Sequence, residues 1–231
     1  MGKIVVLEGT DFSGKTTQYE KLLSRLKAEG IEFGTDSFPN YDSHSSYFVT
    51  SYLRGAFGED ATAIDPKVAS TFYTLDRYAS FKTRDWGNIY RNGGNILFAR
   101  YITSNVLHQA SKYDTFEEKK QFIDWLYDYE VGMFGLPKEN CTILLDMPPE
   151  TAQELKRIRL EQQNGLSSNG SEKDIHESNT EYLRKSYETA KEVSKYLGWN
   201  VVSCVDENGN LRTIEDIHEE IYKIVLDTFD S

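Results

Sequence analysis

The sequence contains little cysteine and no long apolar run. Only two of its 231 residues are cysteines, Cys141 and Cys204, and each lies inside a short apolar segment. Buried thiols in a reducing compartment explain them better than a disulfide or a metal site. No apolar stretch approaches the ~20 residues that a membrane-spanning helix needs. The N-terminal apolar run, residues 4–7, is too short for a signal peptide. These absences predict a cytoplasmic protein.

Positive charge is also scarce. Lys and Arg number 26 against 37 Asp and Glu, which gives a net charge of −11. A chain with this balance lacks the basic surface that binds nucleic acids or anionic membranes, so we expect neither partner. Its overall field also repels phosphorylated ligands, and only local clusters of cations can hold them. The length is sufficient to bury a core and suits a single domain over residues 1–231.

Residues 9–17 contain the most informative motif, because they match the pattern G-x-x-x-x-G-K-S/T. The apolar run at 4–7 predicts a buried strand before the motif, and apolar spacing over 18–28 predicts a helix after it. On such a turn, backbone N–H groups and the helix N-terminus point at one small volume that suits a polyphosphate. Lys15 can reach the outer phosphates, and the Thr16 hydroxyl is placed to bind Mg²⁺. The residues expected to bind ATP are Gly9, Thr10, Asp11, Phe12, Ser13, Gly14, Lys15, Thr16 and Thr17.

Strand-like and helical segments alternate along the chain. This order predicts crossover connections and an α/β fold with three layers, in which helices cover both faces of a five-stranded, mostly parallel sheet. Asp65 and Pro66 are typical of the start of a helix that we expect to reach about Asp85. Pro149 opens another, to about Gln162. The expected strands lie within residues 3–7, 31–38, 95–99, 141–146 and 199–205.

A transferase needs a second cationic pocket opposite the phosphate loop, and two groups of residues could supply it. Arg100, Ser104 and His108 are four residues apart after an expected strand, so we expect them on one helix face at the edge of the sheet. Tyr73 and Arg77 are also four residues apart on an expected helix. An aromatic ring beside a guanidinium suits a nucleobase, because the ring is able to stack on the base and the guanidinium to bind its rim. A lone Tyr is usually core and a lone Arg usually solvated or paired with a carboxylate. Their convergence on the edge that carries the loop favours a binding site.

A polar segment near residue 165 has two interpretations. Residues 162–171 contain few core-forming side chains, and Lys156, Arg157 and Arg159 precede them. The segment is either a solvated surface loop or a mobile lid, within about 156–176, that closes over the transferring phosphate and excludes water.

The chain resembles the thymidylate (dTMP) kinases of the P-loop nucleoside monophosphate kinase fold. The resemblance implies transfer of the ATP γ-phosphate to dTMP, with Mg²⁺ as cofactor, in a protein that is typically a homodimer. The matching stretches follow the family's order over residues 1 to about 190. They are 7–11 with the phosphate loop, 37–43, 76–78, 100–105 with 108–109, and 145–150.

The resemblance also implies roles for individual residues. Lys15, Arg100, Asp11 and the lid residues Arg157 and Arg159 would be catalytic, and Arg100 would hold the acceptor phosphate. The residues implied to bind dTMP are Asp11 (at the sugar 3′-hydroxyl), Phe38 and Leu53 (lining the base pocket), Tyr73 (stacking on thymine), Arg77 (at its O4 edge), Ser104 and Asn105 (near the base, with Asn105 selecting thymine), His108 and Gln109 (near the sugar), and Arg100.

The chain departs from the family pattern at three points. Ala99 stands where the family has an Asp that helps to organise Mg²⁺, and Asn40 stands where many relatives have Arg. The third departure is a lid insert that is longer than the compact lids of many relatives. Phe12 fits the pattern: it occupies a loop position at which some members carry Arg, and members without that Arg carry basic lid residues instead, as Arg157 and Arg159 would be here. The carboxylates that could replace the missing Asp are Asp146, Glu8 and Asp11, and the sequence does not rank them.

Two other functions stay open on the sequence alone. A deoxynucleoside kinase of related fold would need a carboxylate base after the second strand, where Asp36 and Asp42 lie. A nucleotide-binding protein without catalysis would account for Ala99 and Asn40. A GTPase-type switch is disfavoured, because the segment closest to a guanine motif, residues 111–114, follows a helical stretch instead of a strand.

Overall fold

A computed structural model describes residues 1–58, 64–164 and 180–231, without the side chains of 159–164 and 180–182. Its centre is a parallel sheet with the strand order β2-β3-β1-β4-β5. The predicted α/β class is confirmed, and each strand lies within three residues of its expected limits. The strands are β1 (Ile4–Gly9), β2 (Phe33–Ser37), β3 (Asn95–Ala99), β4 (Cys141–Asp146) and β5 (Asn200–Ser203).

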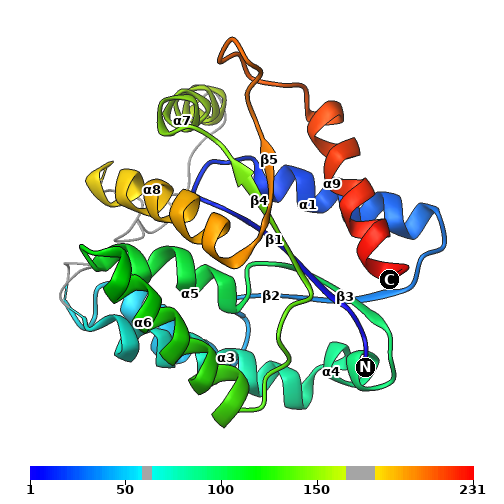
Figure 1. Ribbon diagram of the computed structural model, residues 1–231, viewed down its shortest axis with the longest axis vertical. Coiled ribbons are helices and arrows are strands. Elements are labelled where there is room, and N and C mark those ends of the chain that lie inside the picture. The colour runs from blue at the N-terminus through cyan, green and yellow to red at the C-terminus, as the bar shows by residue number, and fades with distance from the viewer. Residues whose placement is uncertain (59–63, 165–179) are drawn as a thin grey trace.

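Helices cover both faces of the sheet (Figure 1). Successive residues of a strand point to opposite faces, so Ile4 and Val6 pack into one core and Val5 and Leu7 into the other. The first core includes side chains of α3, α5, α6 and α8, and the second includes side chains of α1 and α9. The helices are α1 (Lys15–Ala28), α2 (Tyr47–Leu53), α3 (Pro66–Thr83), α4 (Asp85–Arg91), α5 (Ile102–His108), α6 (Phe116–Tyr127), α7 (Pro149–Asn164), α8 (Thr180–Leu197) and α9 (Ile214–Phe229).

The start of α3 is as predicted, and its end lies close to the predicted limit. The Asp65 carboxylate accepts hydrogen bonds from the backbone N–H groups of Lys67 (2.8 Å) and Val68 (3.3 Å), which satisfies two of the unpaired donors of the first turn. The helix ends at Thr83 because Arg84 is extended (φ −100°, ψ 158°). This residue separates α3 from α4, so α3 ends two residues before the expected limit of about Asp85.

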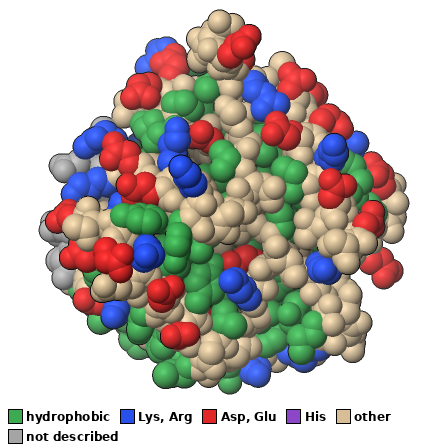
Figure 2. Space-filling view, viewed as in Figure 1, with side chains coloured by type: hydrophobic (Ala, Val, Ile, Leu, Met, Phe, Trp, Pro, Cys, Tyr) green, Lys and Arg blue, Asp and Glu red, His purple; other side chains and the backbone are tan. Residues whose placement is uncertain are grey.

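Charged side chains of both signs lie on the surface. Over the face seen in Figure 2, Lys and Arg side chains are interspersed with Asp and Glu side chains. Among the described residues, no helix has both the length and the apolar character required to cross a membrane.

His218 on α9 is a buried titratable group away from the phosphate loop. Its side chain is 1% exposed, and neither ring nitrogen has a hydrogen-bond partner among the described residues. The ring packs against Tyr222, with 6.0 Å between the ring centroids. Burial lowers the pKa of His218 below its ordinary value of 6.5, and the positive charges of Lys21 and Arg25 on α1 lower it further.

We therefore expect the free energy of unfolding to fall as the pH drops below about 6.5. Above that pH, His218 is neutral in both states. Below it, the unfolded chain takes up a proton that the folded chain resists, until the pH reaches the folded pKa. The slope of this contribution is at most about 1.4 kcal/mol per pH unit. Urea unfolding between pH 7.5 and pH 5 measures it, and an equally steep decline in the His218→Leu variant would contradict the assignment.

Candidate active site

The phosphate loop connects β1 to α1 and lines a cavity. Gly14 has a left-handed backbone (φ +80°) directly before the first turn of α1, a conformation that glycine adopts without strain. A side chain at Gly9 would collide with Ser13 and Leu145. The cavity is lined by Thr10, Asp11, Phe12, Ser13, Gly14, Lys15, Thr16 and Thr17 of the loop, together with Tyr19, Ser37, Phe38, Pro39, Tyr41, Ala99 and Arg100.

Lys15 is held inside the loop. Its ammonium donates a hydrogen bond to the carbonyl of Gly9 (2.8 Å). Burial lowers the pKa of Lys15 to about 8, and the nearby guanidinium of Arg100 contributes to the decrease, whereas Glu8 and Asp11 oppose it. A phosphate beside this ammonium would favour its charged form.

ATP binding is therefore expected to weaken above pH 8. Below that pH, Lys15 is already charged, whereas above it the binding of a phosphate must be accompanied by proton uptake. The association constant is expected to fall by up to about 10-fold per pH unit. Calorimetric titration with ATP and Mg²⁺ from pH 7 to 9.5, in two buffers of different ionisation enthalpy, measures both effects. The Lys15→Arg variant keeps its charge over this range and serves as the control, and a pH-independent affinity in the wild type would contradict the prediction.

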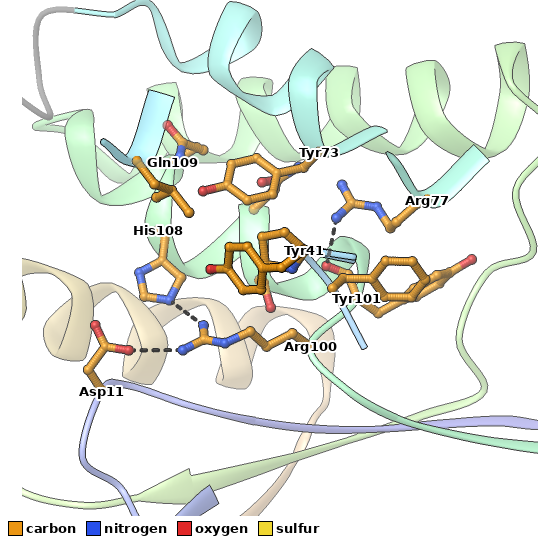
Figure 3. Close-up of a pocket in the computed structure, with 13 residues that line it drawn as sticks. Asp11, Tyr41, Tyr73, Arg77, Arg100, Tyr101, His108 and Gln109 are labelled. Atoms are coloured by element: carbon orange, nitrogen blue, oxygen red, sulfur yellow. Dashed lines mark hydrogen bonds and ion pairs between the residues drawn. The ribbon is translucent and has the colours of Figure 1, made fainter. Parts of the chain in front are cut away.

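Figure 3 shows a second cavity, which shares part of its lining with the first. It is formed by residues from the phosphate loop, from the segment after β2, from α2 and α3, and from the segment that contains α5. Every residue that the sequence implied for dTMP binding lines this cavity, although their individual roles stay predictions. The lining residues are Asp11, Phe38, Pro39, Tyr41, Leu53, Tyr73, Arg77, Arg100, Tyr101, Ser104, Asn105, His108 and Gln109.

The two cavities meet at a shared wall. Asp11, Phe38, Pro39, Tyr41 and Arg100 line both of them. The strands β1 and β3 are neighbours, so the loop that follows β1 and the turn that follows β3 emerge side by side. The guanidinium of Arg100 therefore faces the same space as the loop that contains Lys15. Such an arrangement can hold two phosphate chains end to end.

Arg100 does not lie on the helix face that we expected. It has a left-handed backbone (φ +77°) and precedes α5, which begins at Ile102 after the N-cap residue Tyr101. Its side chain nevertheless reaches His108 on α5, with Arg100 Nη1 3.1 Å from His108 Nε2. The prediction of proximity is thus confirmed, and the prediction of one continuous helix is wrong, because the turn at Arg100 interrupts it.

Arg100 and Asp11 form an ion pair at the shared wall. Arg100 Nη2 lies 2.9 Å from Asp11 Oδ1 (Figure 3). Burial by itself raises the pKa of Asp11, but the positive charges of Arg100, His108 and Lys15 outweigh it and hold the pKa well below its usual range. Asp11 therefore stays ionised at neutral pH and accepts hydrogen bonds without supplying a proton.

Several residues at the site were not identified from the sequence. Pro39, Tyr41 and Tyr101 line the second cavity, and Glu130 lies behind it, 0% exposed and ion-paired with Arg77. Glu130 is separated from Arg77 by 53 positions along the chain, and no local pattern connects them. A lone Arg in a sequence is usually solvated or paired with a carboxylate. Arg77 is paired with a carboxylate, and it also forms part of the cavity wall.

Comparison with known proteins identifies the family. The family model described as thymidylate kinase matches residues 7–221. The chain belongs to the thymidylate kinase family. Thymidylate kinases from Mycobacterium tuberculosis and Caldicellulosiruptor saccharolyticus are 28% identical over 172 residues and 25% identical over 226 residues. The matches cover 74% of this chain and 78% of the first relative, and 98% of this chain and 97% of the second. A solved thymidylate kinase from Candida albicans has the same fold (TM-score 0.65, 19% identity, covering 98% of this chain and 92% of that one).

The lid expected in this member of the thymidylate kinase family is only partly within the described residues. Residues 156–164 belong to α7, and the remainder of the expected lid, with the side chain of Arg159, lies outside them. Arg157 forms an ion pair with Glu154, one turn earlier on the exposed surface of α7 (2.6 Å). In the middle of the same helix, the Lys156 ammonium lies 4.8 Å from the ring centroid of Phe12 in the phosphate loop. Lys156 of α7 thus contacts the loop.

The three carboxylates considered for Mg²⁺ differ in their partners. Asp11 pairs with Arg100. Glu8 accepts hydrogen bonds through Oε1 from Thr103 and Ser104 (2.7 Å each). Glu8 Oε2 and Asp146 Oδ1 are buried and have no hydrogen-bond partner among the described residues. Glu8 and Asp146 therefore retain an oxygen that can bind a cation directly or through water.

Proposed function

We propose that the chain catalyses the transfer of the γ-phosphate of ATP to dTMP, in the cytoplasm and with Mg²⁺. The observation that carries the proposal is the meeting of two cavities at Arg100 and Asp11, one lined by the phosphate loop and the other by aromatic and amide side chains. ATP occupies the first cavity and dTMP the second. The membership of the thymidylate kinase family supports this choice of substrates.

In this mechanism, the protein positions the substrates and neutralises charge. The acceptor is a phosphate oxygen that is already anionic, so no general base is required. Lys15 and Arg100 stabilise charge on the transferring group, and the lid residues Arg157 and Arg159 add to it on closure. Mg²⁺ fits the donors available, since the ion prefers oxygen ligands and keeps several waters. It would be held by the ATP phosphates, the Thr16 hydroxyl and Glu8, and it would neutralise phosphate charge when bound.

A deoxynucleoside kinase is less compatible with the site. That reaction needs a carboxylate that is available to deprotonate a 5′-hydroxyl. Asp36 accepts hydrogen bonds from Ser80 and from the backbone of Ser37, and its Oδ2 lies 3.7 Å from Arg84. Neither Asp36 nor Asp42 lines either cavity among the residues described.

A coupled assay of ADP release across dTMP, dUMP, dGMP and thymidine, with and without Mg²⁺, tests the proposal. We expect turnover with dTMP and Mg²⁺, none with thymidine, and loss of activity when the metal is chelated. The Candida albicans thymidylate kinase has broad substrate specificity, so the dUMP and dGMP arms measure how broad the range is here. Turnover of thymidine instead of dTMP would replace the proposal with the nucleoside kinase. Nucleotide binding without turnover would indicate an inactive homologue.

We also propose a homodimer, on the basis of the family resemblance. In α6, the side chains of Phe122, Ile123 and Leu126 are buried within the chain. The side chains of Phe116, at the start of the same helix, and of Met133, in the turn after it, are exposed. Light scattering coupled to gel filtration would measure the mass, and a monomer at assay concentrations would exclude this assembly.

A further inference from the structure

A buried carboxylate lies directly behind the second cavity. Glu130 is 0% exposed and belongs to η3 (Asp128–Met133), a π-helical turn that follows α6. The turn is closed by backbone hydrogen bonds from Phe134 to Tyr129 and from Leu136 to Glu130, each 3.0 Å. Such turns are rare and occur frequently at functional sites. Glu130 does not line the cavity itself, so any effect that it has on a ligand must pass through its neighbours.

The first neighbour that Glu130 fixes is Arg77. Arg77 Nε lies 2.8 Å from Glu130 Oε2, and Arg77 Nη2 lies 2.5 Å from Glu130 Oε1. Arg77 Nη1 donates to the carbonyl of Tyr101 (3.3 Å), the contact drawn in Figure 3. A guanidinium has five N–H donors in a rigid plane. Three of them are used by these contacts, and the plane is thereby locked at the wall of the cavity.

The second neighbour is Asn105 on α5. Its amide nitrogen lies 3.3 Å from Glu130 Oε1 and 3.5 Å from the carbonyl of Ser70. Both partners are acceptors, so they hold the nitrogen side of the amide toward the protein. The amide oxygen is then the atom that can meet a ligand in the cavity, where Asn105 forms part of the wall.

We propose that Glu130 is a positioning residue that sets the hydrogen-bond polarity of the base pocket. Through Arg77 it presents a donor, and through Asn105 it presents an acceptor. This pair complements a pyrimidine with a carbonyl at position 4 and an N–H at position 3, as in thymine and uracil. Cytosine carries an amino group at position 4, which donates, and an unprotonated nitrogen at position 3, which accepts. In this pocket, donor would therefore face donor and acceptor would face acceptor. The inference rests on the proposed function and specifies how its pocket distinguishes keto from amino pyrimidines.

The charge balance of the Arg77–Glu130 pair also affects binding, because the base of the nucleotide is uncharged. A bidentate carboxylate neutralises the guanidinium, so the base-binding end of the cavity carries donors without net positive charge. The cations near the acceptor phosphate are Lys15 and Arg100, at the other end, where Arg100 is itself paired with Asp11. Glu130 thereby helps to orient a nucleotide with its phosphate toward the loop and its base toward α3.

The Glu130→Gln variant tests this role. Glutamine has nearly the same size as glutamate but has one acceptor oxygen instead of two. The three donors that face Glu130 are Nε and Nη2 of Arg77 and the amide nitrogen of Asn105. Arg77 loses a partner, and the Asn105 amide is free to reverse. We expect the KM for dTMP to rise about 10- to 100-fold, because a buried polar group at the base is left mismatched. The kcat and the KM for ATP are expected to change less than about 3-fold. The preference for dTMP over dCMP in kcat/KM is expected to fall by about the same factor as the KM rises.

Two further variants complete the experiment. Glu139→Gln is the matched control, since Glu139 is a nearby carboxylate that contacts Tyr127 instead of the cavity residues, and it is expected to leave the dTMP-to-dCMP ratio unchanged. Glu130→Asp keeps both acceptors on a shorter side chain and is expected to retain more of the ratio than Glu130→Gln. If Glu130→Gln does not fold, Glu130→Asp carries the test alone, with a several-fold loss of the ratio expected.

The inference would be overturned if a folded variant at position 130 kept the wild-type ratio, or if Glu139→Gln reduced it equally. These outcomes are distinct from a failure of the proposed function, which would be seen as the absence of dTMP turnover in the wild-type protein.

Discussion

Replacing Arg100 with alanine is expected to lower kcat for phosphate transfer to dTMP by about 10²–10³-fold, the loss typical for a preorganised electrostatic group at a reaction centre. The guanidinium lies in the wall shared by the two cavities and is held on one side by Asp11 (2.9 Å) and on the other by His108 (3.1 Å). It therefore needs no reorganisation when charge shifts between the two phosphates. Steady-state assays at saturating ATP and dTMP measure kcat.

The controls separate charge from structure. Arg100→Lys keeps a positive charge without the two-sided contact and is expected to recover part of the rate. Arg91→Ala removes an arginine that donates to Phe81 and Asn88, outside both cavities, and is expected to be active. Thermal unfolding of each variant shows whether the fold survives. A near-normal kcat in a folded Arg100→Ala protein would remove Arg100 from the mechanism.

The elements that the sequence predicted well are those encoded locally. The strand before the phosphate loop is an uninterrupted apolar run because both of its faces are buried, and a central parallel strand requires such a run. Asp65 and Pro66 specify the start of α3 through chemistry confined to one turn. Five residues of the second cavity were predicted from their spacing and chemistry, and the resemblance added Asp11, Phe38, Leu53, Asn105 and Gln109. The structure brings them to one place because parallel strands deliver their following segments to the same edge of the sheet.

The features that the sequence did not predict depend on tertiary packing. Arg100 carries a left-handed backbone although it is not glycine, and a spacing of four residues cannot distinguish such a turn from a continuous helix. Glu130 lies within an aromatic-rich segment, where a single acidic residue is indistinguishable from a solvated one. Its burial follows from the π-helical turn and from its pairing with Arg77 on another helix. Charges of this kind are identified only when both partners are located.

The Arg77–Glu130 pair leads to a second large effect, on stability. Both side chains are almost completely buried, at 1% and 0% exposed. Replacing Arg77 with methionine removes the guanidinium and leaves the carboxylate buried, with the amide of Asn105 still donating to it. We expect the free energy of unfolding to fall by about 3–5 kcal/mol, the usual cost of an unpaired buried charge. Urea unfolding followed by circular dichroism measures it.

The double variant Arg77→Met, Glu130→Met separates the cost of an unpaired charge from the net value of the pair. Removing both charges also removes the desolvation cost that the pair carries in the wild type, so the double variant is expected to recover most of the lost stability and to lie within about 2 kcal/mol of the wild type. A double variant as unstable as the sum of its two single variants would show that the two side chains are not coupled. If the double variant folds but no longer prefers dTMP over dCMP, the buried pair is retained for recognition of the base and not for the stability of the fold.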